Sequence, residues 1–513
     1  MENRRDFIKK LNAIPFLGSL AYTSSSFGIK NISENQIPVD ELKLDKKERN
    51  IHIAYFDPAI GYISNPGMGI NVYAFSDHMH IGYTREEWKK TESKPHLRID
   101  KKLIDKIEHH PFADNIYIRM EWRDIQRNKG KLEFRKEWHW ILDMIERSKK
   151  RWSFRIMNCS PHSENAYSVP DFLIGKMKMQ PYSHTGIVKK PQPKHHSVYD
   201  EDYLKWWSEM LHLLGDKYDN HPLLEYGDIS GLGFWGEGHW WAGSDSSNFS
   251  LDLERLDYLQ DTLINDHLQA FPNTPGVMNI HYAYKGEAGK NAIEKGVWLR
   301  RDSLSPHNFS PFEYHQIQKL NPDAAMVWEV IMPMASRKIK KSDRYATKSF
   351  EQYPQRYFDF GSSFATVGFN PWDAFWAFEN CPDVYVNLAN HLGYRIRPGI
   401  VWRRQVDHQS DHVILGLVNN GCASAPGTFE ITAQFNEKEQ STVTLDAGSP
   451  KPGERALLVP IELPQNLQGT KQKMNIKLTI NLKTRNKVRP VKWAVDQNGK
   501  TGVNVLEFPL YPL

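Results

Sequence analysis

Eight short apolar segments run through most of the chain, and nearly all are separated by amphipathic helical segments. This alternation predicts parallel strands joined by right-handed crossovers. The strands are expected in the segments 67–73, 115–122, 152–162, 224–237, 276–284, 296–304, 324–332 and 362–370. Eight such units predict an α/β fold, a (β/α)8 TIM barrel over residues 60–395. The alternative is an open doubly wound sheet, for which "NPGMGINVY" (65–73) is a poor glycine-rich turn.

After about residue 395 the pattern of the sequence changes. Segments such as "HVILGLVNNG", "GTFEITAQF" and "KMNIKLTINL" are short, alternate apolar with polar residues, and are bounded by turn residues. Such segments are typical of antiparallel strands that bury one face. We therefore predict a C-terminal antiparallel β-sandwich domain over residues 396–513, whose role the sequence does not indicate.

The first residues of the chain carry paired arginines, Arg4 and Arg5, followed by Phe7 and a short apolar run that ends in small residues. This segment resembles a twin-arginine export signal; the alternative is an amphipathic first helix. The apolar run is too short to span a bilayer. We predict an export signal at 1–28, a tether and lead-in at 29–59, and a periplasmic or secreted protein without a stable membrane anchor.

Composition excludes several function classes. A net charge of +5 over 513 residues, without a basic stripe, argues against a nucleic-acid partner. Cys159, Cys381 and Cys422 are odd in number and far apart, so neither a disulfide framework nor a cysteine zinc site is expected. "DHMH" (77–80) has a metal-like spacing but lacks further ligands, so we predict no metal and no cofactor. The sequence does not indicate an oligomeric state.

Two glutamates stand out at the expected carboxyl ends of the barrel strands, where (β/α)8 enzymes place their active sites. Glu237 lies in "GLGFWGEGHWWAG" (231–243) and Glu329 in "AAMVWEVIM" (324–332), and each follows a tryptophan. A pair of carboxyl groups across one bond is what glycoside hydrolysis needs. We predict that Glu237 and Glu329 are catalytic, with aromatic walls that keep Glu237 protonated. The alternative is that each is a strand-end acid paired with an arginine.

Other side chains expected at the mouth are candidates for substrate binding. Aromatic residues make up 12% of the chain, with 16 tryptophans, and flat rings suit either a large core or a sugar-binding groove. We expect about half of the tryptophans near the mouth to face the cleft. The predicted substrate-binding residues are Arg119, Trp122, Asn158, Trp235, His239, Trp240, His281, Trp328 and Trp372.

Three stretches resemble clan A glycoside hydrolases, most closely the family 42 β-galactosidases. The segment 117–145 is similar to their second-strand signature, 231–240 to the strand end that carries the acid/base, and 326–332 to the strand end that carries the nucleophile. The resemblance implies that Glu237 is the acid/base, Glu329 the nucleophile, and that Arg119 steadies the nucleophile. The clan usually has an asparagine directly before the acid/base, whereas this chain has Gly236.

These observations predict an exported glycoside hydrolase of the retaining type that uses two glutamates and acts on a plant or algal polysaccharide or oligosaccharide, with galactose-type sugars favoured. A basic loop at 189–199 could contact acidic or sulfated groups on that carbohydrate. One alternative is a non-catalytic glycan-binding barrel that kept the cleft; another is a metal-dependent hydrolase. The separation of the two carboxyl groups tests whether they are a catalytic pair. Retaining pairs lie roughly 5–5.5 Å apart and inverting pairs roughly 6.5–9.5 Å apart, and a much wider separation would exclude catalysis by this pair.

Overall fold

The structure is a computed structural model of the whole chain. It describes residues 52–75, 101–160, 167–181, 194–197, 200–238, 253–279, 287–301, 324–329, 351, 354–368, 371–406 and 410–511. The predicted export signal therefore lies outside the described residues.

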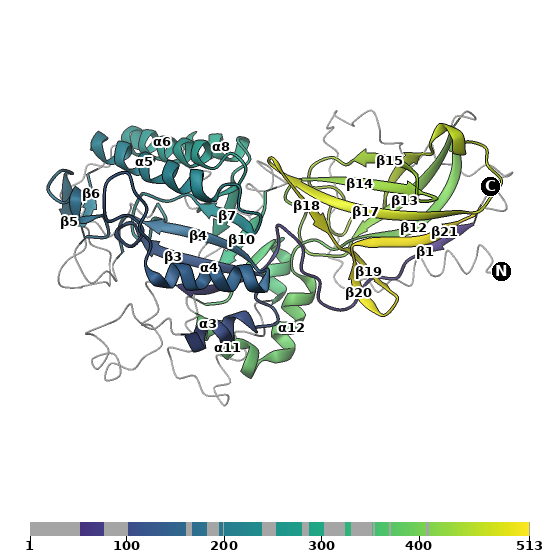
Figure 1. Cartoon of the computed structure of the whole chain (residues 1–513), viewed down its shortest axis with the longest axis horizontal. Coiled ribbons are helices and arrows are strands. Elements are labelled where there is room, and N and C mark those ends of the chain that lie inside the picture. Colours follow the sequence, from purple (N-terminus) through teal and green to yellow (C-terminus); the bar gives the residue numbers. More distant parts are fainter. Residues whose placement is uncertain are drawn as a thin grey trace, which may run out of the picture. The chain divides into compact units, whose positions relative to one another are not determined.

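A closed barrel of parallel strands forms the first part of the described chain (Figure 1). Its strands are β2 (Gly69–Phe75), β3 (Asn115–Glu121), β4 (Arg151–Met157), β7 (Leu224–Asp228), β8 (Gly276–Asn279), β9 (Trp298–Arg301), β10 (Met326–Glu329) and β11 (Phe364–Thr366). Pairing of β11 with β2 closes the barrel. The predicted eight-stranded parallel barrel is confirmed, and the open sheet is wrong.

Helices surround the barrel, as the helical segments between the strands predicted. They are α3 (Lys101–Glu108), α4 (Lys136–Ser148), α5 (Glu201–Tyr218), α6 (Leu253–Ala270), α8 (Glu287–Glu294), α11 (Pro371–Asn380) and α12 (Pro382–His391). Figure 1 shows α5, α6 and α8 side by side on one flank of the strands. The Asp200 side chain accepts hydrogen bonds from the backbone N–H groups of Asp202 and Tyr203, which fixes the start of α5.

Alternation along each strand sends side chains to two different places. On β3, Ile116, Ile118 and Met120 belong to the apolar core that the helices cover. The intervening Tyr117 belongs to a separate interior cluster that fills the barrel, and Arg119 shares its side of the strand. Because polar and charged residues occupy these inward positions near the carboxyl ends of the strands, the barrel interior changes from apolar to charged toward the mouth.

Antiparallel sheets follow the barrel, as predicted from residue 396. One sheet contains β1 (Ile53–Tyr55), β12 (Ile396–Val406), β13 (Ser410–Asn419) and β16 (Leu457–Glu462). The other contains β14 (Thr428–Phe435), β15 (Glu439–Thr444), β17 (Met474–Thr484), β18 (Lys487–Val491) and β21 (Val505–Leu510), and β19 (Trp493–Gln497) pairs with β20 (Lys500–Val503). Alternate residues of both sheets share one apolar core.

The strand β1 comes from the segment predicted as a lead-in. It pairs antiparallel with β12, so that Ile53 lies opposite Trp402. The rings of His52 and Tyr511 are also in contact, with centroids 5.0 Å apart. The alternating "IHIAYF" of this segment is a strand pattern whose partner is more than 300 residues away in the sequence, which is why it could not be assigned to a sheet beforehand.

A second group of charged side chains, two buried and two half-buried, lies at the amino ends of the barrel strands, and we call it the basal cluster: Asp114, Arg151, Glu225 and Arg489. Arg151 Nε lies 3.2 Å from Glu225 Oε2, and Arg489 Nη1 lies 2.7 Å from Glu225 Oε1. The backbone N–H of Gly67 also donates to Glu225 at 2.7 Å. Since Arg489 belongs to β18, this cluster joins the barrel to the second antiparallel sheet.

No helix among the described residues combines the length and the apolar character needed to cross a membrane.

Candidate active site

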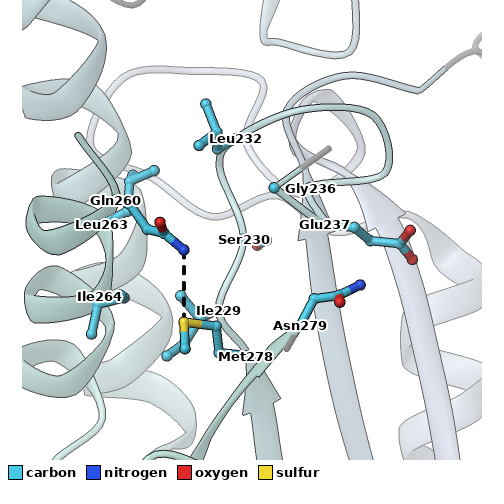
Figure 2. A pocket seen from close by; sticks show the side chains of 11 residues that line it. Ile229, Ser230, Leu232, Gly236, Glu237, Gln260, Leu263, Ile264, Met278 and Asn279 are labelled. Atoms are coloured by element: carbon cyan, nitrogen blue, oxygen red, sulfur yellow. Dashed lines mark hydrogen bonds between the residues drawn. The ribbon is translucent and has the colours of Figure 1, made fainter. Parts of the chain in front are cut away.

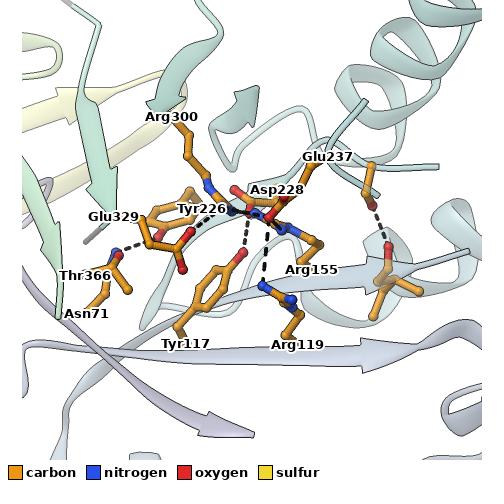
Figure 3. Close-up of polar contacts among 12 residues, drawn as sticks. Asn71, Tyr117, Arg119, Arg155, Tyr226, Asp228, Glu237, Arg300, Glu329 and Thr366 are labelled. Carbon is orange, nitrogen blue, oxygen red and sulfur yellow. Dashed lines mark hydrogen bonds and ion pairs between the residues drawn. The ribbon is translucent and has the colours of Figure 1, made fainter. Parts of the chain in front are cut away.

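Six buried charged side chains meet at the carboxyl ends of the barrel strands, and we call them the mouth cluster (Figure 3). They are Arg119 on β3, Arg155 on β4, Asp228 on β7, Glu237 in the following loop, Arg300 on β9 and Glu329 on β10. None is more than 8% exposed. Three guanidinium groups thus face three carboxyl groups, so the cluster is close to neutral when all are ionised.

Glu329 is the last residue of β10 and accepts hydrogen bonds on both carboxylate oxygens. The Tyr73 hydroxyl donates to Oε1 at 2.6 Å, and Arg300 Nη2 donates to Oε2 at 2.7 Å. Burial, reinforced by the charge of Glu329, raises the pKa of Tyr73 well above its usual value, so the phenol remains a donor. Glu329 is therefore held in one orientation by a neutral donor and a cation.

Glu237 does not end a strand, which corrects the prediction. β7 ends at Asp228, and Glu237 follows in a loop that contains several glycines with positive φ and Trp235 with φ 56°. This backbone conformation interrupts the extended run. Gly236 has φ +71°, and a Cβ there would lie 2.7 Å from Cβ of Ser230. The asparagine that the clan places before its acid/base would therefore be strained at this position.

Guanidinium groups, rather than aromatic rings, make the described polar contacts of Glu237. Arg155 Nη1 donates to Oε1, Arg300 Nη2 lies 2.9 Å away, and Arg119 Nη1 lies 3.8 Å away. Three cations thus lie close to this carboxyl group, which the sequence did not predict. The sequence missed these contacts because the arginines come from three other strands.

The two glutamates are close together because they share one nitrogen. Arg300 Nη2 is 2.9 Å from Glu237 Oε1 and 2.7 Å from Glu329 Oε2, so these two oxygens are no more than 5.6 Å apart. This upper limit lies below the spacing of roughly 6.5–9.5 Å that leaves room for a water in inverting glycosidases. Arg300 is thus a cation paired with Glu329, and Arg119, which was expected to steady Glu329, lies 3.5 Å through Nη1 from the Tyr73 hydroxyl that donates to it.

Asp228, a site residue that sequence reasoning missed, contacts two of the arginines that also contact the glutamates. Its Oδ2 accepts from Arg155 Nε at 2.8 Å, from Arg300 Nη1 at 3.2 Å, and from the Tyr117 hydroxyl. Burial raises the pKa of Asp228 to about 6, although Arg155 and Tyr117 act in the opposite direction. A charged residue at the end of the strand segment "LEYGD" was the available signal for it.

Below the charges, a polar layer fixes the strands. The Asn71 amide donates to the Tyr226 hydroxyl and to the Thr366 hydroxyl, each at 3.0 Å (Figure 3). The Asn115 amide donates to Asn71 Oδ1 at 2.8 Å. These hydrogen bonds join side chains of β2, β3, β7 and β11 inside the barrel. They therefore fix the strands that carry the mouth cluster.

Two of the tryptophans predicted at the cleft belong to the core instead. Trp122 is fully buried against Trp207, with ring centroids 5.2 Å apart, and its indole donates to Gln126. Trp328 is fully buried beside Phe360. Trp328 alternates with Glu329 on β10, so its side chain takes the helix-facing side of the strand. Large buried rings here fill the space between strands and helices.

Three further residues predicted to bind substrate belong to the described part of the chain. Trp235 and Trp372 are half-buried at the edge of the barrel core. Asn158 is buried after β4, and its amide lies 3.0 Å from His195 Nε2, which also accepts from the Gly233 N–H. Contact of these three with substrate stays a prediction. The other predicted substrate-binding residues lie outside the described residues: His239, Trp240 and His281.

A small cavity of about 30 Å³ lies between the loop after β7, α6 and β8, beside Glu237 (Figure 2). Its polar lining consists of Ser230, Glu237, Gln260 and Asn279, and its apolar lining includes Leu263. This volume holds about two water molecules and is far smaller than the several hundred Å³ of a typical ligand site. The described residues thus provide a water-sized space next to Glu237.

Among the residues that the structure describes, no group of three or more histidine, cysteine, aspartate or glutamate side chains is arranged to hold a metal ion. The "DHMH" segment lies outside them.

No family model and no curated protein sequence matches the chain. Similar solved structures include a beta-galactosidase from the psychrophilic Marinomonas ef1, 8% identical with a TM-score of 0.33 over 58% of this chain and 53% of that chain. A GH5-4 broad specificity endoglucanase from an uncultured bacterium is 10% identical, with a TM-score of 0.39 over 63% and 93% of the two chains. Endo-glycoceramidase II from Rhodococcus sp. is 9% identical, with a TM-score of 0.38 over 79% and 100%.

The chain spans about half the length of the Marinomonas beta-galactosidase that it matches.

Proposed function

We propose that this protein is a retaining glycoside hydrolase with Glu329 as nucleophile and Glu237 as acid/base. The supporting observation is that two buried carboxylates at the mouth of a parallel barrel share Arg300 Nη2, which limits their nearest oxygens to 5.6 Å apart. Retaining enzymes hold their carboxyl pair at roughly 5–5.5 Å.

In the first step, Glu329 Oε attacks the anomeric carbon of the sugar while the glycosidic bond breaks. Glu237 gives its proton to the leaving oxygen, and the sugar is left as an ester on Glu329. In the second step, Glu237 takes a proton from water, whose oxygen attacks the anomeric carbon and releases Glu329. The donors on Glu329 suit a nucleophile, because the Tyr73 hydroxyl and Arg300 stabilise its ionised form.

The arginines around Glu237 suit a carboxylate that accepts a proton from water in the second step. Protonation of the leaving oxygen in the first step is the part that these cations make harder. Separate rates for the formation and the hydrolysis of the sugar ester on Glu329 therefore test the role of Glu237 in each step.

We further propose a divergent clan A enzyme with a C-terminal β-sandwich, exported through its twin-arginine-like segment and acting on a galactose-type plant or algal glycan. The resemblance of 117–145, 231–240 and 326–332 supports the clan, and the shared apolar core of the two antiparallel sheets supports the sandwich. The acidic or sulfated character of the glycan stays a prediction.

The test compares Glu329→Ala and Glu237→Ala with wild type on plant and algal polysaccharides and on an activated aryl glycoside. Glu329→Ala should abolish turnover of both, and azide should restore turnover of the aryl glycoside by replacing the nucleophile. Glu237→Ala should lose the polysaccharide activity but keep much of the first step on the aryl glycoside, which needs little protonation.

The matched control is Glu137→Gln, which alters a glutamate that is also buried but lies on α4 and pairs with Arg135; its rates should equal those of wild type. Polysaccharide turnover by either alanine variant at the wild-type rate would remove that residue from the mechanism. Binding of a glycan by wild type without any turnover would instead favour the non-catalytic glycan-binding barrel.

A further inference from the structure

Asp228 connects the two glutamates although it contacts neither through the described hydrogen bonds. Its single oxygen Oδ2 receives both Arg155, through Nε at 2.8 Å and Nη2 at 2.5 Å, and Arg300, through Nη1 at 3.2 Å. The remaining ends of the same two guanidinium groups donate to Glu237 and Glu329. Each arginine therefore has one end on Asp228 and another on a glutamate.

This arrangement divides the positive charge of two arginines among three carboxyl groups. If the charge on Asp228 is lost, these arginines are left with two carboxylates instead of three, and the mouth cluster gains one net positive charge. A guanidinium fork is rigid and planar, so a change at one end is also passed to the other end as a change in orientation.

The placement of Asp228 fits an indirect role. The side chain is 2% exposed, and its Oδ1 is buried without a hydrogen-bond partner within the described part of the chain. A buried carboxyl oxygen without a partner lowers stability, so stability alone does not account for an aspartate at this position.

We propose that Asp228 is a positioning residue that sets the orientation of Arg155 and Arg300, and thereby the charge balance between Glu237 and Glu329. This inference rests on the proposed function. The charged and titratable groups that face this network are Tyr73, Tyr117, Arg119, Arg155, Tyr226, Glu237, Arg300 and Glu329.

The decisive variant is Asp228→Asn, which has nearly the same shape without the charge. We expect kcat to fall about 10²-fold with KM changed by no more than about 3-fold, as for the loss of an oriented electrostatic contact. Both limbs of the pH profile of kcat/KM should move to lower pH, because an extra positive charge favours the ionised form of both glutamates. Asp228→Glu, which keeps the charge, should restore the position of both limbs.

Two further variants keep the inference falsifiable if Asp228→Asn folds poorly. Tyr117→Phe removes one hydrogen bond to Asp228 Oδ2 at nearly constant volume, and kcat should fall about 3- to 10-fold. Glu225→Gln is the matched control, because it neutralises a buried carboxylate near the other end of β7 that also contacts two arginines. It should lower the thermal unfolding midpoint without moving the pH profile.

The outcomes separate the two proposals. A wild-type pH profile in Asp228→Asn, with Glu329→Ala inactive, overturns the role of Asp228 and leaves the proposed function standing. A loss of kcat in Asp228→Asn with an unmoved profile, and with the thermal loss seen in Glu225→Gln, shows a purely structural role and also overturns it. If wild type turns over no glycoside, the proposed function fails and this inference fails with it.

Discussion

Arginines and carboxylates gather at both ends of the barrel, and two strands, β4 and β7, contribute to both groups. β4 carries Arg151 into the basal cluster and Arg155 into the mouth cluster; β7 carries Glu225 into the first and Asp228 into the second. In the basal cluster, Glu225 pairs with Arg489 of β18 and joins two parts of the fold. In the mouth cluster, the arginines link carboxylates that belong to the barrel and its own loop.

The two clusters differ in which part of the protein contacts them beyond the barrel strands. The basal cluster is closed by a second sheet: Arg489 and Lys487 of β18 reach the barrel, and Lys487 Nζ donates to Thr274 at 2.8 Å. The mouth cluster stands at the carboxyl ends of the strands, where barrels bind substrates. A cluster of buried charges therefore does not by itself indicate an active site. Its position at the carboxyl ends of the barrel strands is what indicates one. The following predictions test this comparison.

The largest effect is expected from Arg300→Met, which removes the nitrogen shared by Glu237 and Glu329. The carboxyl pair should lose both its spacing and its compensating charge, and kcat/KM should fall about 10³-fold, which corresponds to about 4 kcal/mol. Steady-state kinetics on a responsive glycoside measures it, with circular dichroism to verify folding. A loss below about 5-fold in a folded variant would contradict the bridging role.

Arg489→Met makes the same change in the basal cluster. Loss of one partner leaves Glu225 buried with reduced compensation, and the free energy of unfolding should fall by about 3–5 kcal/mol. Denaturant unfolding measures it, and kcat at 25 °C should stay within about 2-fold of wild type in the folded protein. If kcat instead falls as far as in Arg300→Met, the two ends of the barrel are not functionally distinct.

A smaller effect is expected from the pH dependence of the free energy of unfolding, to which Asp228 and Lys487 contribute with opposite signs. Burial raises the pKa of Asp228 to about 6 from 3.8, so its contribution to stability is full below about 4 and is lost as pH rises through 6. Burial lowers the pKa of Lys487 to about 8 from 10.5, so its contribution is gained as pH rises from 8 to 10.5. Unfolding of wild type, Asp228→Asn and Lys487→Met across these ranges measures both. Parallel curves for wild type and a variant would contradict the corresponding shift.

The sequence was sufficient for the barrel because most of its strands lie in short, largely apolar segments, and burial of such segments on both faces is what a closed parallel sheet requires. Glu329 was identified for the same reason, since it directly ends one of these runs. Glu237 was identified from its neighbours, but its place in a loop was missed, because positive φ at Gly236 and Trp235 depends on close packing that spacing does not reveal.

Arg155 and Asp228 could not be paired from the sequence. They lie 73 residues apart and meet because β4 and β7 are neighbours with a register shift between Trp152 and Ser153. A shift of one residue changes which side chains face inward, so strand order alone would have been insufficient. The assignment of Trp122 and Trp328 to the cleft failed because a tryptophan fills a barrel–helix interface as well as it lines a groove.

The pairing of β1 with β12 brings the two ends of the described chain together, where the rings of His52 and Tyr511 touch. A peptide linker between these ends would be short, and new termini could be opened in a surface loop of the barrel. Such a circular permutant would keep every strand pairing of both sheets and the barrel. The order of these segments along the described chain is thus separable from their architecture, and β1 could equally follow β21 in the sequence.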